Sequence, residues 1–253
     1  MSAPTWVFLR GLMRDQRHWG EFPHVFRDLI PDTRIECLDF AGNGTRHRER
    51  SARTIEAMAD DARADLLRRG LKPPYRLLAM SLGAMAATSW ADRHPQDIDA
   101  CVLINTSLRP FSPPHWRLRP KVWPRVLEIA LRPPAPRAIE AMILDLTTQL
   151  ARRPERAPQA LLDQWTAWRE SDPVSRSNAL RQLLAAAAYR APKRCPDTRV
   201  LILNGAKDEL VDSRCSRRLA ERWGCPLRVH PEAGHDLPLD DGHWVAASIR
   251  NWL

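Results

Sequence analysis

Residues 75–87 read YRLLAMSLGAMAA, a pattern that predicts a short buried strand followed at once by a helix. One serine, Ser81, stands where the strand ends, so it must lie in a sharp turn. Small residues at Ala79 and Gly83 let the strand and the helix pass close together, which lifts the serine hydroxyl clear of the backbone. This is the geometry of a nucleophile elbow. The alternative interpretation is a serine that merely caps the helix.

The rest of the chain alternates strands with helices. Further strands are predicted at 6–10, 34–40, 100–104, 199–204 and 226–230, and helices at 20–30, 54–69, 213–223 and 242–253. This alternation is typical of an α/β protein with a mostly parallel sheet of about six strands flanked by helices.

The alternation stops between residues 108 and 194. Prolines there separate short amphipathic helices, predicted near 121–132, 138–151, 158–170 and 175–190. We therefore expect a core formed by residues 1–107 and 195–253, with residues 108–194 inserted as a helical lid.

Composition excludes several classes of function. The chain has 253 residues and a formal charge of +9, and its basic residues are nearly all arginines spread along the whole sequence. With no nucleic-acid-binding motif, such a spread does not indicate a nucleic-acid partner. Five scattered cysteines without a CxxC motif indicate neither a disulfide framework nor a metal site. No apolar run is long enough to span a bilayer, so we expect a cytoplasmic protein.

Three reactive side chains directly follow predicted strands: Ser81, Asp208 and His235. The carboxyl ends of parallel strands lie at one edge of a sheet, where ligands bind. A serine needs a base to remove its proton, histidine can act as base and then as acid, and a carboxylate fixes the histidine tautomer. The backbone N–H groups of Leu82 and of Leu12, which follows Gly11, are the candidates for an oxyanion hole.

Each of these residues also has a plainer interpretation. Asp208 could be a helix-capping or turn residue, and His235 a surface histidine. Rival acids are scarce, however, because Asp212 lies beyond the predicted loop and the fourth strand ends in Asn105. Their joint occurrence in the order Ser, Asp, His favours a catalytic triad.

Over essentially its whole length the chain resembles the α/β-hydrolase fold family. The resemblance is carried by residues 79–83, similar to the family's Gly-x-Ser-x-Gly, by the turn at 39–44, the acid loop at 204–208 and the histidine loop at 234–235. Ala79 replaces the first glycine of the elbow, and Arg10 replaces the histidine of the family's His-Gly motif. The resemblance implies a small carboxylesterase-like serine hydrolase without a cofactor or metal.

The predicted lid is rich in arginine and tryptophan. Residues 109–137 contain seven basic residues against one acid, Glu128. One interpretation is a solvated basic face on tryptophans that pack the lid against the core. The other is an apolar pocket, with Trp116 and Trp123 binding substrate, and a basic rim that attracts an anionic substrate or an acidic carrier protein.

We therefore expect a serine hydrolase that cleaves a carboxylic ester or thioester through an acyl-enzyme on Ser81. The alternatives are an acyltransferase or C–C bond hydrolase with the same triad, a non-catalytic binding protein that kept the fold, and a peripheral lipase that docks on membranes through residues 122–131. No motif indicates the substrate, the acyl chain length or the oligomeric state.

Overall fold

Six parallel strands form one sheet in the computed structural model, which describes residues 3–131 and 134–253. The strands are β1 Thr5–Leu9, β2 Arg34–Leu38, β3 Tyr75–Met80, β4 Ile98–Ile104, β5 Arg199–Gly205 and β6 Leu227–His230. Their order across the sheet is β2-β1-β3-β4-β5-β6, and every neighbouring pair is parallel. The predicted α/β fold class is confirmed.

The chain reverses its direction across the sheet between β1 and β3. It runs from β1 outward to β2, then crosses to β3 on the other side of β1 and continues outward to β6. At such a switch point the connections that leave two neighbouring strands diverge, so a crevice opens at their carboxyl ends. Because Leu9 lies opposite Ala79, this crevice lies between the residues that follow Leu9 and the turn at Ser81.

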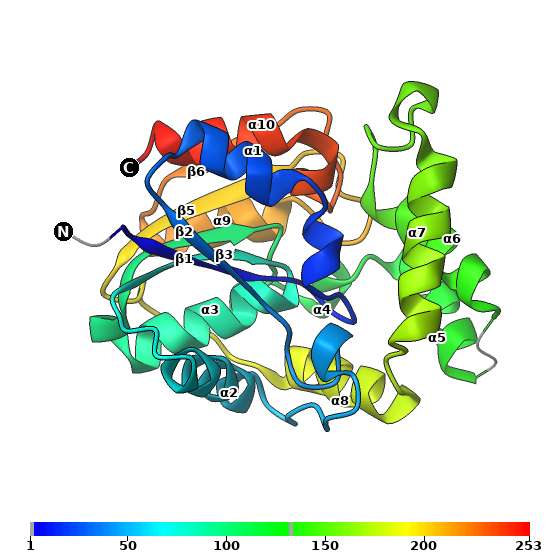
Figure 1. The fold of residues 1–253 in the computed structure, drawn as a ribbon, viewed down its shortest axis with the longest axis horizontal. Helices are drawn as coiled ribbons and strands as arrows, with labels where there is room; N and C mark the ends of the chain where they lie inside the picture. Colours follow the sequence, from blue (N-terminus) through cyan, green and yellow to red (C-terminus); the bar gives the residue numbers. More distant parts are fainter. Residues whose placement is uncertain (1–2, 132–133) are drawn as a thin grey trace.

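Helices cover both faces of the sheet. Helices α1 Phe22–Leu29 and α10 Leu237–Arg250 lie on one face, and α2 Ile55–Arg68 and α3 Leu82–Arg93 lie on the other (Figure 1). Helix α9 Arg214–Trp223 packs into the same core cluster as α2 and α3. Strand β1 shows why two cores form, because Trp6 and Phe8 point into one cluster while Val7 and Leu9 point into the other.

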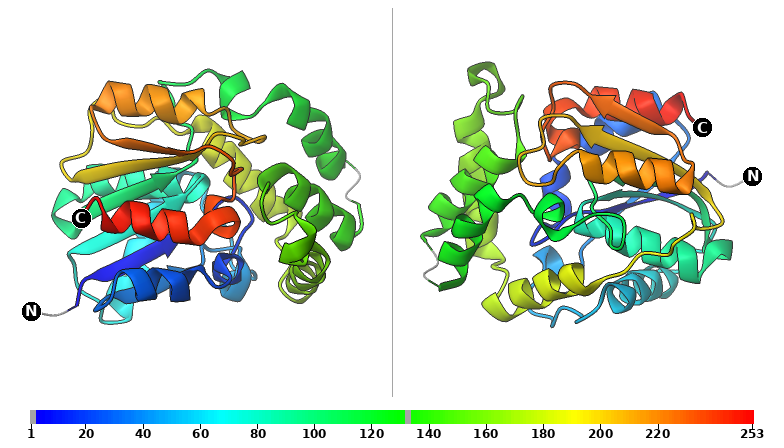
Figure 2. Two further views of the ribbon diagram at one scale, coloured as in Figure 1. Left: turned by 90° about the horizontal axis from the view of Figure 1, so that it is seen from above. Right: turned by 180° about the vertical axis from the view of Figure 1, so that it is seen from behind.

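A helical segment connects β4 to β5. It contains α4 Pro114–Arg117, α5 Trp123–Leu131, α6 Pro136–Thr147, α7 Pro158–Ser171 and α8 Arg176–Ala188. Helices α5, α6 and α7 stand beside one end of the sheet (Figures 1 and 2), whereas α8 packs on the core through Ala185, as does Tyr189 directly after it. The four helices expected here are present, although the end predicted at Arg132 lies outside the described residues.

Short 3-10 helices complete the secondary structure: η1 Gln16–Trp19, η2 Gly44–Arg46, η3 Pro95–Asp97, η4 Pro120–Val122 and η5 Pro154–Arg156. The last α-helix differs from the prediction, because α10 begins at Leu237 rather than at residue 242. Pro238 suits the first turn of a helix. The helix is then broken at Asp241, whose backbone has φ −149° and ψ 79°. The sequence pattern revealed only the part after this break.

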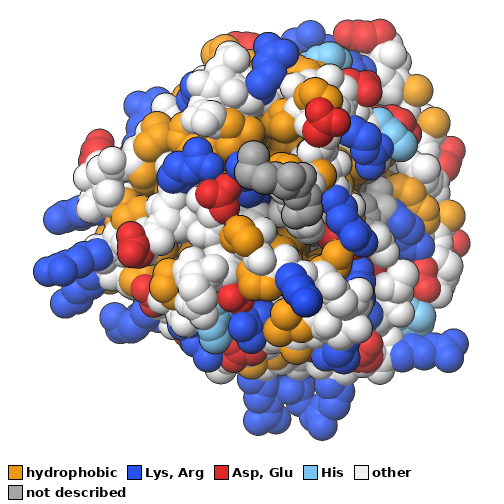
Figure 3. Space-filling view, turned by 60° about the vertical axis from the view of Figure 1, so that its left-hand side comes forward, with side chains coloured by type: hydrophobic (Ala, Val, Ile, Leu, Met, Phe, Trp, Pro, Cys, Tyr) orange, Lys and Arg blue, Asp and Glu red, His pale blue; other side chains and the backbone are white. Residues whose placement is uncertain are grey.

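The surface carries basic side chains in many places. Figure 3 shows lysines and arginines scattered over the visible face, with acidic residues between them. Among the residues that the structure describes, no helix is long and apolar enough to cross a membrane. The same residues contain no group of three or more His, Cys, Asp or Glu side chains placed to hold a metal ion.

We expect Gly83→Ala to destabilise the protein, although alanine is the better helix former. A Cβ atom at Gly83 would clash with the backbone oxygen of Leu9 and lie 2.5 Å from that of Arg10. Neither oxygen can move without distorting β1, so we expect a loss of about 1–3 kcal/mol in the free energy of unfolding. Urea denaturation measures it. An unchanged or higher stability would show that strand and helix have room to separate.

Candidate active site

Ser81 occupies a strained turn between β3 and α3. Its backbone has φ 54° and ψ −116°, a conformation that non-glycine residues rarely adopt and that costs about 1–3 kcal/mol. The N–H of Ser81 donates to the carbonyl oxygen of Ile104 at 2.9 Å, and the hydroxyl of Thr106 donates to the carbonyl oxygen of Ser81 at 3.3 Å. The end of β4 therefore holds the turn in place.

Two backbone segments converge on the Ser81 hydroxyl. Leu82 is the first residue of α3, where an N–H group has no partner inside the helix. On the other side of the crevice, a Cβ atom on Gly11 would lie 3.2 Å from the Ser81 Cβ and 3.7 Å from its Oγ. The peptide that follows Gly11 carries the N–H of Leu12. Both N–H groups predicted for an oxyanion hole thus belong to segments that border the serine.

His235 and Asp208 form a buried pair at the ends of β6 and β5. The Nδ1 atom of His235 lies 2.7 Å from Oδ2 of Asp208, and the two side chains are 3% and 0% exposed. Oδ1 of Asp208 accepts the N–H groups of Leu210 at 2.9 Å and Val211 at 2.8 Å. A carboxylate only accepts hydrogen bonds, so Nδ1 is the donor and Nε2 of the neutral imidazole keeps its lone pair.

Asn105 joins the loops that carry these residues. Its Nδ2 group donates to the carbonyl oxygens of Gly234 at 3.1 Å and His235 at 2.7 Å. Its Oδ1 atom accepts Nδ2 of Asn204 at 2.8 Å and the N–H of Gly205 at 2.9 Å. From the sequence, Asn105 is notable only as a strand end that carries no acid. The feature of the sequence that points to Asn105 is its position as a polar residue directly after a buried strand.

Asp240 attaches the histidine loop to the helical segment. Its buried carboxylate accepts the N–H of Gly234 at 2.7 Å and those of Gln149, Leu150 and Ala151 at 3.0–3.1 Å. Burial raises the pKa of the Asp240 carboxyl, and the backbone hydrogen bonds oppose this rise. This contact, which no sequence pattern indicates, fixes the residues that follow α6 to the loop of His235.

A second buried group of charges lies between η1 and the helical segment. Arg14 donates to Oε2 of Glu140 at 2.7 Å, and Arg169 donates to the other carboxylate oxygen of Glu140 at 2.5 Å. Arg14 also lies 2.9 Å from Nε2 of His18 and 4.3 Å from the centre of the Trp165 ring. Because a guanidinium only donates, Nε2 of His18 must be the acceptor of a neutral imidazole.

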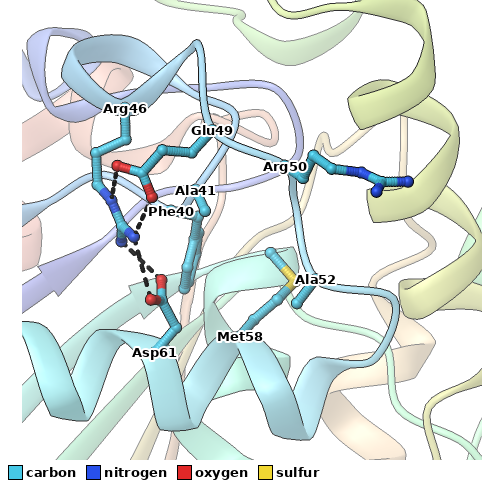
Figure 4. A pocket seen from close by; sticks show the side chains of 8 residues that line it. All are labelled: Phe40, Ala41, Arg46, Glu49, Arg50, Ala52, Met58 and Asp61. Carbon is cyan, nitrogen blue, oxygen red and sulfur yellow. Dashed lines mark hydrogen bonds and ion pairs between the residues drawn. The ribbon is translucent and has the colours of Figure 1, made fainter.

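Two cavities lie beside the segments that follow β2 and β1. The larger, about 210 Å³, is lined by eight residues drawn in Figure 4: Phe40, Ala41, Arg46, Glu49, Arg50, Ala52, Met58 and Asp61. Arg46 extends to Glu49 and Asp61, so its charge is neutralised at the cavity wall. The smaller lies beside Arg14 and Trp168, and its volume of about 10 Å³ accepts no more than a water molecule. Neither lining includes Ser81 or His235.

The two tryptophans predicted to bind substrate lie in different surroundings. Trp116 packs against α9, with the Arg214 guanidinium 4.2 Å from its ring centre. Trp123 is 49% exposed, and its Nε1 donates to the carbonyl oxygen of Leu118 at 3.1 Å. These contacts do not join either ring to Ser81, so their part in substrate binding stays a prediction.

Several basic residues of the predicted rim have acidic partners. Lys121 lies 3.0 Å from Glu209, Arg125 lies 3.2 Å from Asp145, and Arg137 pairs with Asp163 at 2.5 Å. These acids belong to other parts of the chain than residues 109–137. The basic excess seen in the sequence is therefore partly neutralised at this surface.

Comparison with known families identifies the fold family. The sequence model described as the Alpha/beta hydrolase family matches residues 6–248. The chain belongs to this family. Helices on both faces of a parallel sheet, a serine in a turn after β3 and a histidine after the last strand agree with that membership.

Esterase-like hydrolases are among its relatives. The chain is 28% identical to the pimeloyl-[acyl-carrier protein] methyl ester esterase of Chromobacterium violaceum, over 92% of this chain and 78% of that protein. A shorter match, 27% identical over 35% of this chain, spans only 27% of the uncharacterized protein YbdG of Bacillus subtilis.

Solved structures share the fold at lower sequence identity. The enol-lactonase of Burkholderia xenovorans LB400 superposes with a TM-score of 0.80 at 19% identity. The match covers 100% of this chain and 92% of the lactonase chain. A thermophilic esterase from Thermogutta terrifontis superposes with a TM-score of 0.76 at 21% identity, over 99% and 89% of the two chains. These likenesses describe the fold.

We expect the stability of the protein to fall as the pH falls from about 6.5 to about 4. Burial, together with the charge of Arg14, lowers the pKa of His18 to about 4. The unfolded chain protonates this histidine below about pH 6.5, whereas the folded chain does so only below about pH 4. Between these two values protonation stabilises the unfolded state alone, so the free energy of unfolding decreases. The loss amounts to about 3 kcal/mol. Urea denaturation of the wild type and of His18→Gln, which keeps an acceptor for Arg14 but cannot titrate, isolates the effect. Equal pH dependence in both proteins would contradict it.

Proposed function

We propose that this protein is a serine hydrolase that cleaves a carboxylic ester or thioester through an acyl-enzyme on Ser81. The proposal rests on the buried hydrogen bond between His235 and Asp208. It orients a neutral imidazole whose free nitrogen can take a proton, in a family whose relatives include esterases. Ser81 stands in a strained turn at the same edge of the sheet.

The chemistry follows from the roles of these groups. Nε2 of His235 removes the proton from the Ser81 hydroxyl as the oxygen attacks the substrate carbonyl, and Asp208 stabilises the imidazolium that forms. The imidazolium then protonates the leaving alcohol or thiol. Water, deprotonated by the same histidine, attacks the acyl-enzyme and releases the carboxylic acid.

The oxyanion of each tetrahedral intermediate needs fixed donors. The N–H groups of Leu12 and Leu82 fit this role because both belong to segments that border Ser81. The hydrogen bonds found in the described part of the chain use neither group. Removal of one such donor typically costs about 3 kcal/mol of transition-state stabilisation.

The substrate proposed is a small ester. The esterase relatives support this class, and the helical segment at the end of the sheet supports a lid role for residues 108–194. An acyl group on an acidic carrier protein is the more specific prediction. The name of the Chromobacterium relative supports it, whereas the ion pairs of Lys121, Arg125 and Arg137 reduce the free charge available for such a partner.

Labelling with a fluorophosphonate tests the nucleophile. We expect one adduct per chain on the wild type, by intact mass, and none on Ser81→Ala or His235→Ala, because only an activated serine attacks the probe. Ser107 also follows a strand at this edge, so Ser107→Ala is the matched control and should label like the wild type. An adduct on Ser81→Ala, or none on folded wild type, would refute the proposal.

A pair of substitutions tests the acid. Asp208→Asn should lower kcat for a p-nitrophenyl ester by about 10³- to 10⁴-fold, because the amide favours the wrong histidine tautomer. Asp212→Asn removes a carboxylate only four residues further along, which pairs with Arg214, and should leave kcat within a few-fold of the wild type. A large loss in Asp212→Asn with little loss in Asp208→Asn would reverse the assignment.

A further inference from the structure

A buried ion pair joins two residues that neighbour the proposed site in the sequence. Arg10 follows β1, and Asp236 follows His235. The guanidinium donates to both carboxylate oxygens of Asp236, from Nη2 at 2.6 Å and from Nη1 at 3.1 Å. The two side chains are only 1% and 3% exposed. Such a two-bond contact fixes direction as well as distance.

Arg10 also reaches the nucleophile turn. Its Nη1 atom lies 3.7 Å from the sulfur of Met80, the residue before Ser81. Its guanidinium lies 4.8 Å from the centre of the Trp19 ring, which holds it from another side. The backbone of Arg10 leads directly into Gly11 and Leu12. The Arg10 side chain therefore contacts Met80, which precedes Ser81, and Asp236, which follows His235. The Arg10 backbone belongs to the segment that carries the candidate oxyanion donor.

Stability alone does not explain this pair. The desolvation of two buried charges largely cancels their attraction, and apolar residues of similar size often replace such pairs without loss. The Nε atom of Arg10 is moreover buried without a hydrogen-bond partner, which adds to the cost. Because net stability is a weak reason for such a pair, its place beside Ser81 and His235 points to a role in the site.

We propose that Arg10 is a positioning residue that holds the oxyanion segment, the Ser81 turn and the His235 loop in register through its two-bond contact with Asp236. The inference rests on the proposed hydrolase function. It assigns a role to the arginine that replaces the histidine of the family's His-Gly motif.

The same pair balances charge beside His235. Several charged side chains lie around the loop of His235. The carboxylates are Asp208 after β5, and Asp236 and Asp240 around the start of α10. The guanidiniums are those of Arg10 and Arg14 after β1, and Arg14 is itself paired with Glu140 of α6. Burial alone would raise the pKa of the Asp236 carboxyl, but the charge of Arg10 holds that pKa below its usual value. The Asp236 charge is therefore present and is offset by Arg10.

Removing either partner shifts this balance in opposite directions. In Arg10→Gln the Asp236 carboxylate is left unbalanced and favours the imidazolium, so the acidic limb of the rate profile moves to higher pH. In Asp236→Asn the guanidinium is unbalanced, and the limb moves to lower pH. These shifts report only the charge balance around His235, so the positioning role is tested with variants in which no buried charge is left unpaired.

The test is the second-order rate of fluorophosphonate labelling between pH 5 and 9, followed by intact mass. The double variant Arg10→Gln/Asp236→Asn buries no unpaired charge, and Arg10→Lys keeps the charge paired, so both should remain folded. We expect a 10- to 100-fold lower rate in each, because a shift of about 1 Å in reacting groups costs about that much. The acidic limb should stay at the wild-type pH in both variants.

A second ion pair provides the control. Arg63 of α2 pairs at 2.5 Å with the buried Asp97, which precedes β4 at the opposite end of the strands, although Arg63 is 30% exposed against 1% for Arg10. Arg63→Gln/Asp97→Asn should label at the wild-type rate. A wild-type labelling rate in folded Arg10→Lys, or in the folded double variant, would overturn the positioning role. Unfolding of both variants would also overturn it, because the pair would then be structural. If the wild type itself forms no adduct, the proposed function fails instead.

Discussion

The close approach of α3 to β1 is the constraint on which the site depends. Gly83 lies against the backbone oxygens of Leu9 and Arg10, where no Cβ atom fits. This contact allows α3 to begin with only one residue between it and the end of β3, so Ser81 alone makes the turn and takes a positive φ. The same contact brings Gly11 so close to the Ser81 side chain that a Cβ atom on Gly11 would lie 3.2 Å from the Ser81 Cβ. One missing side chain thus positions both the hydroxyl and the segments that carry the candidate oxyanion donors.

A second set of constraints holds the loops at the other strand ends. Asn105 uses both hydrogens of its amide and both lone pairs of its oxygen to join the end of β5 to the carbonyl groups around His235. Asp240 fixes the same loop from the side of the helical segment. Because loops on separate strands have no covalent reason to stay in register, these buried polar contacts supply the rigidity that a positioned base requires.

The sequence was sufficient for the features that are local. The strands, the glycine after Ser81 and the polar residues that end strands follow from short patterns, and the common edge at the carboxyl ends of parallel strands is where Ser81, Asp208 and His235 are expected. The contacts between distant residues were not predictable in this way. Arg10 and Asp236 are 226 positions apart, and Asn105 meets His235 across 130, so no periodicity or spacing connects them. Arg10 was visible only as a departure from a motif, and its partner became visible only in three dimensions.

The helical segment between β4 and β5 is hydrogen-bonded to the loops that follow β1, β2 and β6. Gln182 of α8 accepts the N–H of Met13 at 3.0 Å and donates to Asn43 at 2.7 Å. Glu140 of α6 holds Arg14, and the carbonyl oxygen of Thr147 accepts the N–H of Asp236 at 2.6 Å. A rigid swing of the whole segment would break these buried bonds together, and each broken bond would leave an unpaired polar group. Ser81 itself is partly exposed, so reaching it does not require such a swing, and α8 and the end of α6 can keep the contacts that hold the residues beside His235 and Leu12.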